Sequence, residues 1–326
     1  MKSFVFSTLI GFLLLAGCSK QNFQTVNDEN SFLAAASYNA NVDILWVIDN
    51  SYATMEVHQN RIADKMQSFY DGLIANKTNF RIAATTMDMS SGGAQGDLLG
   101  SVPVISKSTP NAVARLQELL KRGGQGNNSE IGLGAMKRAL EKEVSKGTAA
   151  RFLRDDALLV IVFVTDDRDF SIGTPNDYKN FLDGLKGENT LKNQKWIANY
   201  IGVTDLNDPN CRTYGDYSAK GDDYIELAQG SGGVSDSICD TDFSSYIDQI
   251  TLRLKSVLNR YKLEDIPILD SLTVYKNRAL IRRDSTDGWI YETETNTVVL
   301  NGSAKPGPND DIEIKFEIKT KLKNKN

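Results

Sequence analysis

Oxygen-bearing side chains follow two of the most apolar runs of the sequence. Asp49 and Ser51 come directly after the run 42–48, and Asp166 follows the run 157–164. Carboxylate and hydroxyl oxygens are the ligands that hard divalent cations such as Mg²⁺ prefer. Such apolar runs are typical of strands buried on both faces of a parallel sheet, and ligand sites of these sheets lie beyond the carboxyl ends of the strands. The pattern predicts that these side chains meet at one edge.

The elements that position these residues alternate between strands and helices. We expect strands at 42–48, 80–86, 157–164 and 196–203, a hairpin or edge strand at 98–105, and helices near 62–73, 109–120, 133–140, 223–229 and 243–258. The helix at 109–120 should begin with Thr109 as its cap and Pro110 in its first turn. This alternation predicts an α/β fold with a doubly wound, mostly parallel sheet.

Two short motifs resemble those of the von Willebrand factor type A (VWA) family. The first strand of that family ends in Asp-x-Ser-x-Ser, and here Asp49-Asn50-Ser51-Tyr52-Ala53 follows the first apolar run. A later strand of the family ends in a Thr-Asp pair, which Thr165-Asp166 matches. The resemblance implies a Rossmann-like VWA domain over residues 41–262.

The resemblance also implies a metal-ion-dependent adhesion site (MIDAS). Asp49, Ser51, Asn127 and Asp166 would hold Mg²⁺ or another divalent cation, and an acidic side chain of a protein or cell-surface ligand would complete its shell. The sequence departs from the family pattern at two positions. Asn127, or alternatively Ser129, stands where the family has Thr.

The second departure is Ala53, which stands where the family has its second Ser. An alanine methyl cannot bind a cation, although Thr54 or a water molecule could take its place. If no ion is bound, Asp49 and Asp166 would instead cap the segments that follow them.

The first residues resemble the signal peptide of a bacterial lipoprotein. One lysine precedes an apolar run that is too short to span a bilayer, and Leu15-Ala16-Gly17-Cys18 resembles a lipobox. This implies removal of residues 1–17, acylation of Cys18, and a flexible tether over 18–40, whereas the alternative is ordinary secretion with an incidental cysteine. Ser19 favours the outer membrane of a Gram-negative bacterium, on either its periplasmic or its outer face.

Export determines how the other cysteines are interpreted. With Cys18 acylated, Cys211 and Cys239 remain, and an oxidising compartment favours a disulfide between them over a free reactive thiol. The bond would close a loop of about 28 residues and stabilise the fold by about 3 kcal/mol.

Composition argues against several functional classes. The chain has 326 residues, a formal charge of −5 and 40% hydrophobic residues, which is ordinary for a globular protein without a basic face for nucleic acid. A single histidine, His58, and three cysteines argue against a Cys/His zinc cluster and leave His58 as the one base for a Ser-His-Asp triad. We expect His58 at the surface and no enzymatic activity.

Other acidic residues have weaker claims to a site. In Asp166-Asp167-Arg168-Asp169 we expect only Asp166 to serve the ion site, with the others solvated, although Ca²⁺ binding or local ion pairs are alternatives. Asp205, Asp208 and Asp216 could form a calcium loop near Cys211, but their spacing fits no known motif.

The C-terminal part has a different pattern. Short alternating runs separated by turn residues predict a small antiparallel β module over 263–320, packed on the α/β domain, followed by a solvated basic tail at 321–326. Trp289 is expected as a buried anchor, with a binding role as the alternative.

Together these features predict a lipid-anchored binding protein. The alternatives are a structural subunit of an envelope complex with a vestigial ion site, and an exported hydrolase that uses acidic residues.

Overall fold

The computed structural model describes residues 26–28, 41–76, 78–146, 152–155, 157–187, 195–211, 217, 219–240, 242–306 and 310–318. The expected signal peptide, Cys18, most of the tether and the basic tail lie outside these residues, as does Asp216. No helix in the described part of the chain is long and apolar enough to cross a membrane.

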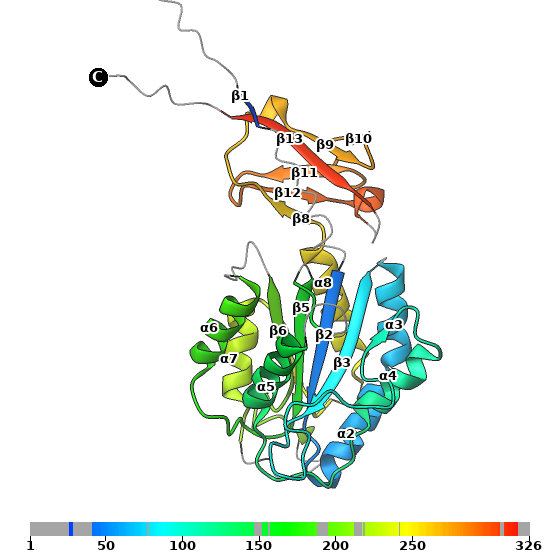
Figure 1. The fold of residues 1–326 in the computed structure, drawn as a ribbon, viewed down its shortest axis with the longest axis vertical. Helices are drawn as coiled ribbons and strands as arrows, with labels where there is room; N and C mark the ends of the chain where they lie inside the picture. Colours follow the sequence, from blue (N-terminus) through cyan, green and yellow to red (C-terminus); the bar gives the residue numbers. More distant parts are fainter. Residues whose placement is uncertain are drawn as a thin grey trace, which may run out of the picture.

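A six-stranded sheet forms the centre of the larger domain (Figure 1). In spatial order its strands are β4 (Ile105–Ser106), β3 (Asn79–Thr86), β2 (Asn41–Ile48), β5 (Leu158–Thr165), β6 (Trp196–Gly202) and β7 (Ser235–Ser237). All neighbouring pairs are parallel except β3 with β4, which is antiparallel. Of the segment 98–105, only Ile105 lies in a strand, because pairing at this edge is limited to two residues.

Helices cover both faces of the sheet. One face carries α2 (Tyr52–Asp64), α3 (Met66–Ala75), α4 (Ala112–Leu120) and α8 (Ser244–Val257), and the other carries α5 (Gly132–Ser145), α6 (Pro175–Lys186) and α7 (Asp222–Ser231). Along β2, Ile44 and Trp46 pack into the first core, whereas Leu45 and Val47 pack into the second. Because successive side chains of a strand point to opposite faces, a continuous apolar run fills both cores. The expected mostly parallel, two-sided α/β architecture is confirmed.

Two helices differ from their expected form. The apolar repeat at 62–73 spans two helices that meet at Lys65, not one helix. The helix expected from Thr109 begins at Ala112, after Asn111 in the left-handed region at φ 54°. Thr109 does not cap it, because Thr109 Oγ1 accepts a hydrogen bond from Ser106 N instead.

The C-terminal part forms two small antiparallel sheets. One contains β11 (Trp289–Glu292), β12 (Thr297–Leu300) and β8 (Arg260–Lys262), and the other contains β1 (Val26–Asp28), β13 (Ile312–Ile318), β9 (Thr273–Lys276) and β10 (Ala279–Ile281). Two 3-10 turns, η2 (Leu269–Ser271) and η3 (Gly302–Ala304), complete this β module. The two sheets enclose a core of their own in which Trp289 is buried, as expected, with its indole N–H donating to Ile281 O.

The β module extends beyond its expected limits on both sides. β8 pairs with β12, so the module begins at Arg260 instead of residue 263. β1 lies inside the segment expected as a tether and pairs with β13. Both short strands form backbone hydrogen bonds with a neighbouring strand. A segment of three residues is too short for apolar periodicity to reveal such pairing.

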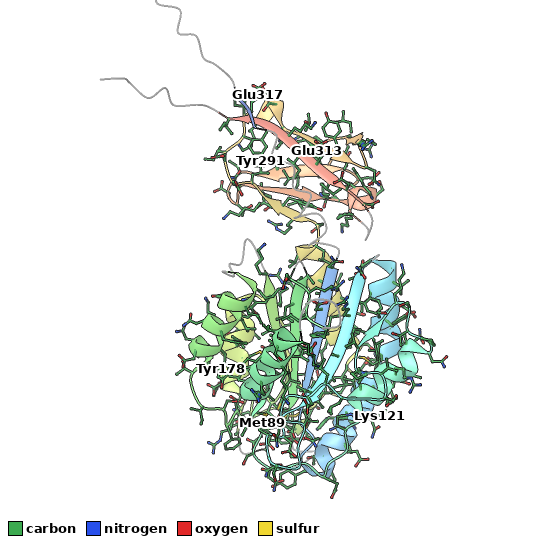
Figure 2. The ribbon with its side chains drawn as sticks, viewed as in Figure 1. Met89, Lys121, Tyr178, Tyr291, Glu313 and Glu317 are labelled. Carbon is green, nitrogen blue, oxygen red and sulfur yellow. A yellow bond between two sulfur atoms is a disulfide. The ribbon has the colours of Figure 1, made fainter. Side chains whose placement is uncertain are left out.

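The β module lies beside the amino ends of the main parallel strands. A pocket between the two parts is lined by Ala75 and Asn76, just before β3, and by Gly302 and Ser303 of the module. Met89, which follows β3, lies at the opposite end of the domain (Figure 2). The carboxyl edge of the sheet therefore faces away from the β module.

Candidate functional site

The ends of β2 and β5 bring the first expected residues together. Ile48 pairs with Val164, and Asp49 N donates to Val164 O at 2.8 Å, so Asp49 lies beside Thr165. Thr165 Oγ1 donates to Asp49 Oδ2 at 2.8 Å, and Ser51 N donates to Asp49 Oδ1 at 2.7 Å. Asp49 and Ser51 are both buried. The register of two parallel strands thus determines where this carboxyl group lies.

Asp166 and Thr54 complete this side of the site. Thr54 Oγ1 donates to Asp166 Oδ2 at 3.1 Å, although the two residues are 112 positions apart in the sequence. Ala53 is exposed, and Thr54 next to it supplies a hydroxyl group to the site. Thr54 is the residue considered in the sequence analysis as a replacement for the family's second serine.

Glu130 is a buried carboxyl group of the site that sequence reasoning missed. It lies just before Ile131, the N-cap of α5. Burial raises its pKa against the effect of the Ser51 hydroxyl, and the charges of Asp167 and Asp166 add to the rise. Its charge in turn raises the pKa of Asp49. The available signal was a single acidic residue at the end of a polar loop before a helix, whereas the residues predicted from this loop were Asn127 and Ser129.

Asn127 has a different environment. Its side chain is exposed, and Asn127 Oδ1 accepts a hydrogen bond from Ser129 N at 3.0 Å. Asn127 N donates to Asp88 Oδ2 at 3.2 Å, which fastens the loop to the segment after β3. Burial alone would raise the pKa of Asp88, but hydrogen bonds from Ser90 and Asn127 hold it below its usual value. Asn127 as an ion ligand stays a prediction, as does Ser129, which is also exposed.

Gln59 of α2 joins the glycine-rich loop to the backbone of Asp49. The buried Gln59 amide donates to Asp49 O at 2.8 Å and to Gly123 O at 2.9 Å, and its oxygen accepts from Gly123 N at 2.9 Å. Gly124 lies so close to Tyr52 that an added Cβ would approach Tyr52 O to 2.2 Å. The loop between α4 and α5 is therefore held against the loop after β2 by close packing and by Gln59.

The electrostatics of the site are those of acids largely shielded from water, since Asp49 and Glu130 are buried and Asp166 is half-buried. Burial, followed by the charges of Glu130 and Asp166, raises the pKa of Asp49 to about 8. Burial raises the pKa of Asp166 to about 6, against the effect of the Thr54 hydrogen bond. Among the residues that the structure describes, no lysine or arginine forms an ion pair with Asp49, Glu130 or Asp166. Clustered buried carboxylates without a counter-charge are unfavourable unless protons or a cation neutralise them.

The donor atoms available match a hard cation. The Ser51 hydroxyl lies beside Asp49 and Glu130 and lowers the pKa of each, yet Ser51 Oγ makes no hydrogen bond of normal geometry with a described residue. Glu130 Oε2 is likewise buried without a hydrogen-bond partner among the described residues. Orphaned buried oxygens together with anionic carboxylates fit Mg²⁺ or Mn²⁺ better than a softer metal. Asp49, Ser51, Glu130 and Asp166 would hold such an ion.

Of two residues expected to be solvent-exposed, His58 is buried and Asp169 is half-buried. His58 lies on the buried face of α2, with Nε2 3.0 Å from Tyr217 Oη, and burial lowers its pKa to about 4. Asp169 was expected to be solvated, but its Oδ1 accepts hydrogen bonds from Gly132 N, Leu133 N and the Tyr224 hydroxyl. Both expectations are wrong because packing by distant elements, not local polarity, sets the burial of these side chains.

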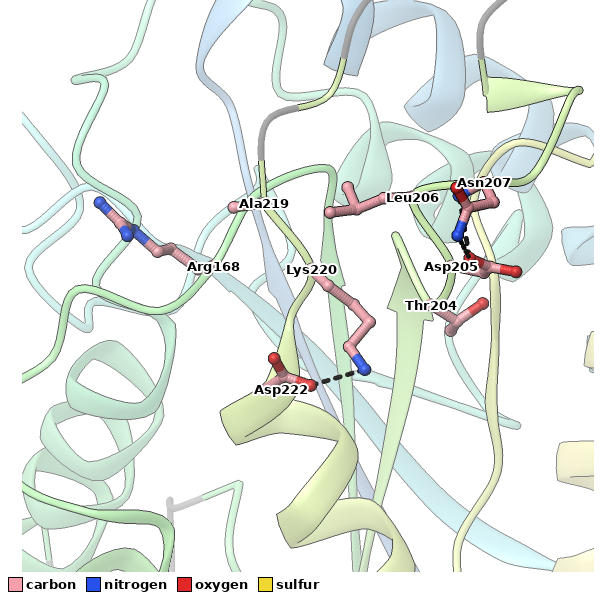
Figure 3. A pocket seen from close by; sticks show the side chains of 8 residues that line it. All are labelled: Arg168, Thr204, Asp205, Leu206, Asn207, Ala219, Lys220 and Asp222. Atoms are coloured by element: carbon pink, nitrogen blue, oxygen red, sulfur yellow. Dashed lines mark hydrogen bonds and ion pairs between the residues drawn. The ribbon is translucent and has the colours of Figure 1, made fainter.

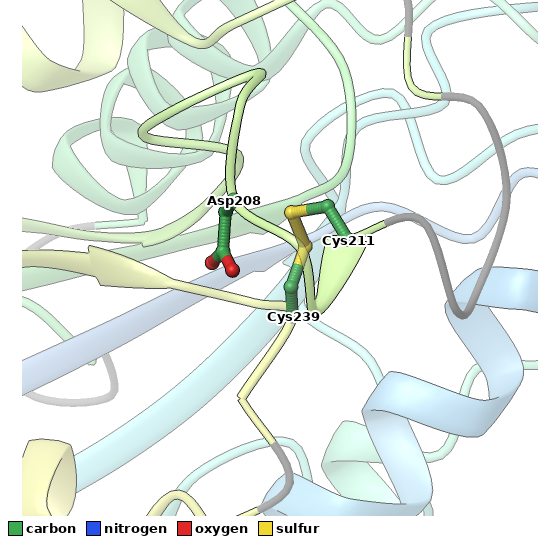
Figure 4. Close-up of side chains that lie close together, drawn as sticks. All are labelled: Asp208, Cys211 and Cys239. Atoms are coloured by element: carbon green, nitrogen blue, oxygen red, sulfur yellow. A yellow bond between two sulfur atoms is a disulfide. The ribbon is translucent and has the colours of Figure 1, made fainter.

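The predicted disulfide joins Cys211 and Cys239, both buried (Figure 4). Asp208 lies beside it and accepts a hydrogen bond from the Ser237 hydroxyl at 2.9 Å. Because the two sulfurs are bonded to each other, this group is not a metal site. Asp205 and Asp208 accept hydrogen bonds from nearby backbone N–H groups, which is a local structural role.

No family model matches the chain, and no curated protein matches it. Solved structures give low-identity matches. Proximal thread matrix protein 1 from the mussel byssus is 16% identical with a TM-score of 0.37, over 66% of this chain and 46% of that one. Another structure of that protein, described with a zinc-occupied MIDAS motif, is 16% identical with a TM-score of 0.36, over 67% of this chain and 47% of that one. The pilus adhesin SpaC from Lactobacillus rhamnosus GG is 11% identical with a TM-score of 0.42, over 86% of this chain and 39% of that one. This chain therefore spans less than half the length of each of these proteins.

Proposed function

We propose that this chain is a binding protein whose VWA-like domain holds a divalent cation at the carboxyl edge of its sheet. The supporting observation is the cluster of three carboxyl groups, the buried Asp49 and Glu130 and the half-buried Asp166, without a cationic partner among the described residues. Packing them together is unfavourable for the protein alone and favourable once an ion is bound. A bound cation would supply an electrophilic centre that attracts an acidic side chain of a protein or cell-surface ligand.

The residues around the cluster orient it and limit its motion. Thr165 and the Ser51 backbone fix the Asp49 carboxyl, Thr54 fixes Asp166, and Gln59 fixes the neighbouring loop. We propose recognition and no reaction for this site, because the single histidine is buried away from solvent with a pKa of about 4.

We also propose that Cys18 carries lipid and anchors the chain in the outer membrane of a Gram-negative bacterium. The lipobox-like sequence Leu15–Cys18 supports this proposal. β1 belongs to the β module, and the candidate site lies at the other end of the α/β domain. This arrangement would direct the site away from the membrane.

Thermal unfolding with and without Mg²⁺ or Mn²⁺ tests the ion site. A ligand present at 100 times its Kd stabilises the native state by about 2.7 kcal/mol. We expect a rise in Tm for the wild type and for the control Asp64→Ala, which alters an exposed acid of α2, and no rise for Asp49→Ala.

Glu130→Gln separates ion binding from simple structural damage. It should raise the Tm of the ion-free protein, because it removes one of the mutually repelling charges, and it should reduce the response to Mg²⁺. If millimolar Mg²⁺ and Mn²⁺ leave the wild-type Tm unchanged, the ion site is refuted and a structural subunit with a vestigial site is favoured. Turnover of a glycoside or ester panel would instead support a hydrolase.

A further inference from the structure

Large apolar side chains stand exposed just after the carboxyl ends of β2, β5 and β6. Tyr52 follows β2 and is 57% exposed, Phe170 and Ile172 follow β5 and are 39% and 98% exposed, and Leu206 follows β6 and is 46% exposed. Single exposed apolar residues are ordinary on a protein surface. Here, however, they lie at the same edge of the sheet as the acidic centre, and Phe170 N donates to Glu130 O, an arrangement that resembles a polar anchor point with an apolar surround.

Hydrogen bonds on either side of Ile172 hold the backbone in the conformation that exposes its side chain. Phe170 N donates to Glu130 O at 2.8 Å, the Tyr178 hydroxyl donates to Ile172 O at 2.9 Å, and Gly134 N donates to Ser171 Oγ at 2.8 Å. Thr174 then starts α6 with a reciprocal capping box. The loop 167–174 is therefore ordered before any partner arrives, which lowers the entropy cost of binding there.

A positive charge accompanies this apolar loop. The Arg168 guanidinium lies 4.9 Å from the centre of the Phe170 ring and, within the described part of the chain, has no ion-pair partner. A pocket of about 470 Å³ separates Arg168 from Leu206, and Figure 3 shows these residues on opposite sides of it. Lys220 and Asp205 also line this pocket. Lys220 pairs with Asp222 at 2.8 Å, and Asp205 accepts hydrogen bonds from Asn207, so the cation of the lining that is open to a partner is Arg168.

We propose that the loop 167–174 and this pocket form a second docking surface beside the ion site, and that the partner is an acidic protein segment. One acidic side chain of the segment reaches the ion, an adjacent apolar side chain covers Ile172 and Phe170, and a second acidic side chain pairs with Arg168. Apolar burial supplies affinity, and Arg168 supplies one point of charge complementarity, which fixes where the second acidic side chain lies. This inference rests on the proposed function, since the first acidic side chain needs the ion.

A random heptapeptide library displayed on phage, selected with Mg²⁺ and with EDTA, tests this proposal on the full chain. We expect Mg²⁺-dependent peptides with two acidic residues and one large apolar residue. Peptides selected on Arg168→Gln should lose the second acidic residue, and the best wild-type peptide should bind Ile172→Ser about tenfold more weakly by fluorescence anisotropy. Leu280→Ser, which alters a 65% exposed leucine of the β module, is the matched control and should bind as the wild type does.

The outcomes separate the two proposals. Mg²⁺-dependent peptides that bind Ile172→Ser and Arg168→Gln as tightly as the wild type would overturn the docking surface and leave the ion site intact. A Tm response to Mg²⁺ without any enriched peptide would also overturn the docking surface. Peptides that bind equally well in EDTA, together with no Tm response to Mg²⁺, would overturn the proposed function itself.

Discussion

Replacing Asp169 with alanine should destabilise the α/β domain through a few identifiable contacts. Asp169 Oδ1 accepts hydrogen bonds from Gly132 N at 2.9 Å and Leu133 N at 3.2 Å, in the first turn of α5, and from the Tyr224 hydroxyl at 2.8 Å. Loss of the helix cap costs about 1 kcal/mol. A buried tyrosine hydroxyl left without its acceptor costs about 2 kcal/mol more. We therefore expect the free energy of unfolding to fall by about 3 kcal/mol.

The carboxylate charge itself adds little to this value. Burial raises the pKa of Asp169 above its usual value, although hydrogen bonds from Ser171, Tyr224 and the α5 backbone act against the rise. The charged form is therefore not favoured overall by the fold. Asp169→Asn keeps one acceptor oxygen, so we expect a loss of only about 1 kcal/mol.

Urea denaturation followed by tryptophan fluorescence measures these differences, and Tyr224→Phe completes a double-mutant cycle. Met87 Sδ, 3.6 Å from the hydroxyl, is a weak acceptor and should recover little energy. In the double variant the orphaned hydroxyl is gone, so the cycle should give a coupling of about 1 to 2 kcal/mol. A loss below about 1 kcal/mol for Asp169→Ala, or additive single effects, would refute the argument that Asp169 satisfies these donors.

Three further predictions concern other parts of the α/β domain. Gln59→Leu keeps the side-chain volume but removes the hydrogen bonds to Asp49 and the glycine-rich loop, so urea titration should show a loss of about 3 kcal/mol; an unchanged midpoint would contradict the role given to Gln59. Burial lowers the pKa of His58 from 6.5 to about 4 and so keeps it neutral. The free energy of unfolding should therefore be highest above pH 6.5 and should fall by about 3 kcal/mol, relative to His58→Asn, as the pH falls toward 4. Parallel pH profiles of the two proteins would contradict this. Cys211→Ser with Cys239→Ser should cost about 3 kcal/mol in urea titration, and no reducing agent should change the stability of that variant.

The sequence predicted the main sheet and part of the site because both depend on local patterns. The runs before Asp49 and Asp166 are apolar on both faces, and their parallel pairing brings the two carboxyl groups to one edge. Glu130 could not be selected in the same way, because its place in the cluster depends on how the glycine-rich loop packs against Tyr52 and Gln59. Such packing depends on contacts between segments more than 60 positions apart.

Burial of polar residues was the weakest part of the sequence interpretation. His58 and Asp169 look like surface residues by their neighbours in the chain, yet Tyr217 and Tyr224 reach them from elements far along the sequence. The limits of the β module were misjudged for a similar reason, since β1 and β8 are only three residues each and gain their place by pairing. In each case the deciding partner lies outside the local window that periodicity examines.

The position of Asp49 at the end of β2 has a mechanical consequence. β2 begins at Asn41, near the β module, and its 8 residues run straight to the loop that carries the candidate site. Tension between a captured ligand and the chain that precedes Asn41 would act along the axis of this strand. β2 is bonded on both sides, to β3 and to β5, so force that enters through Asp166 at the end of β5 and leaves through Asn41 at the start of β2 would load the ladder between these two strands in shear instead of peeling one rung after another. Shear loading breaks the hydrogen bonds of a ladder together, so the proposed anchor and ion site would withstand more force than a geometry that peels the strands apart.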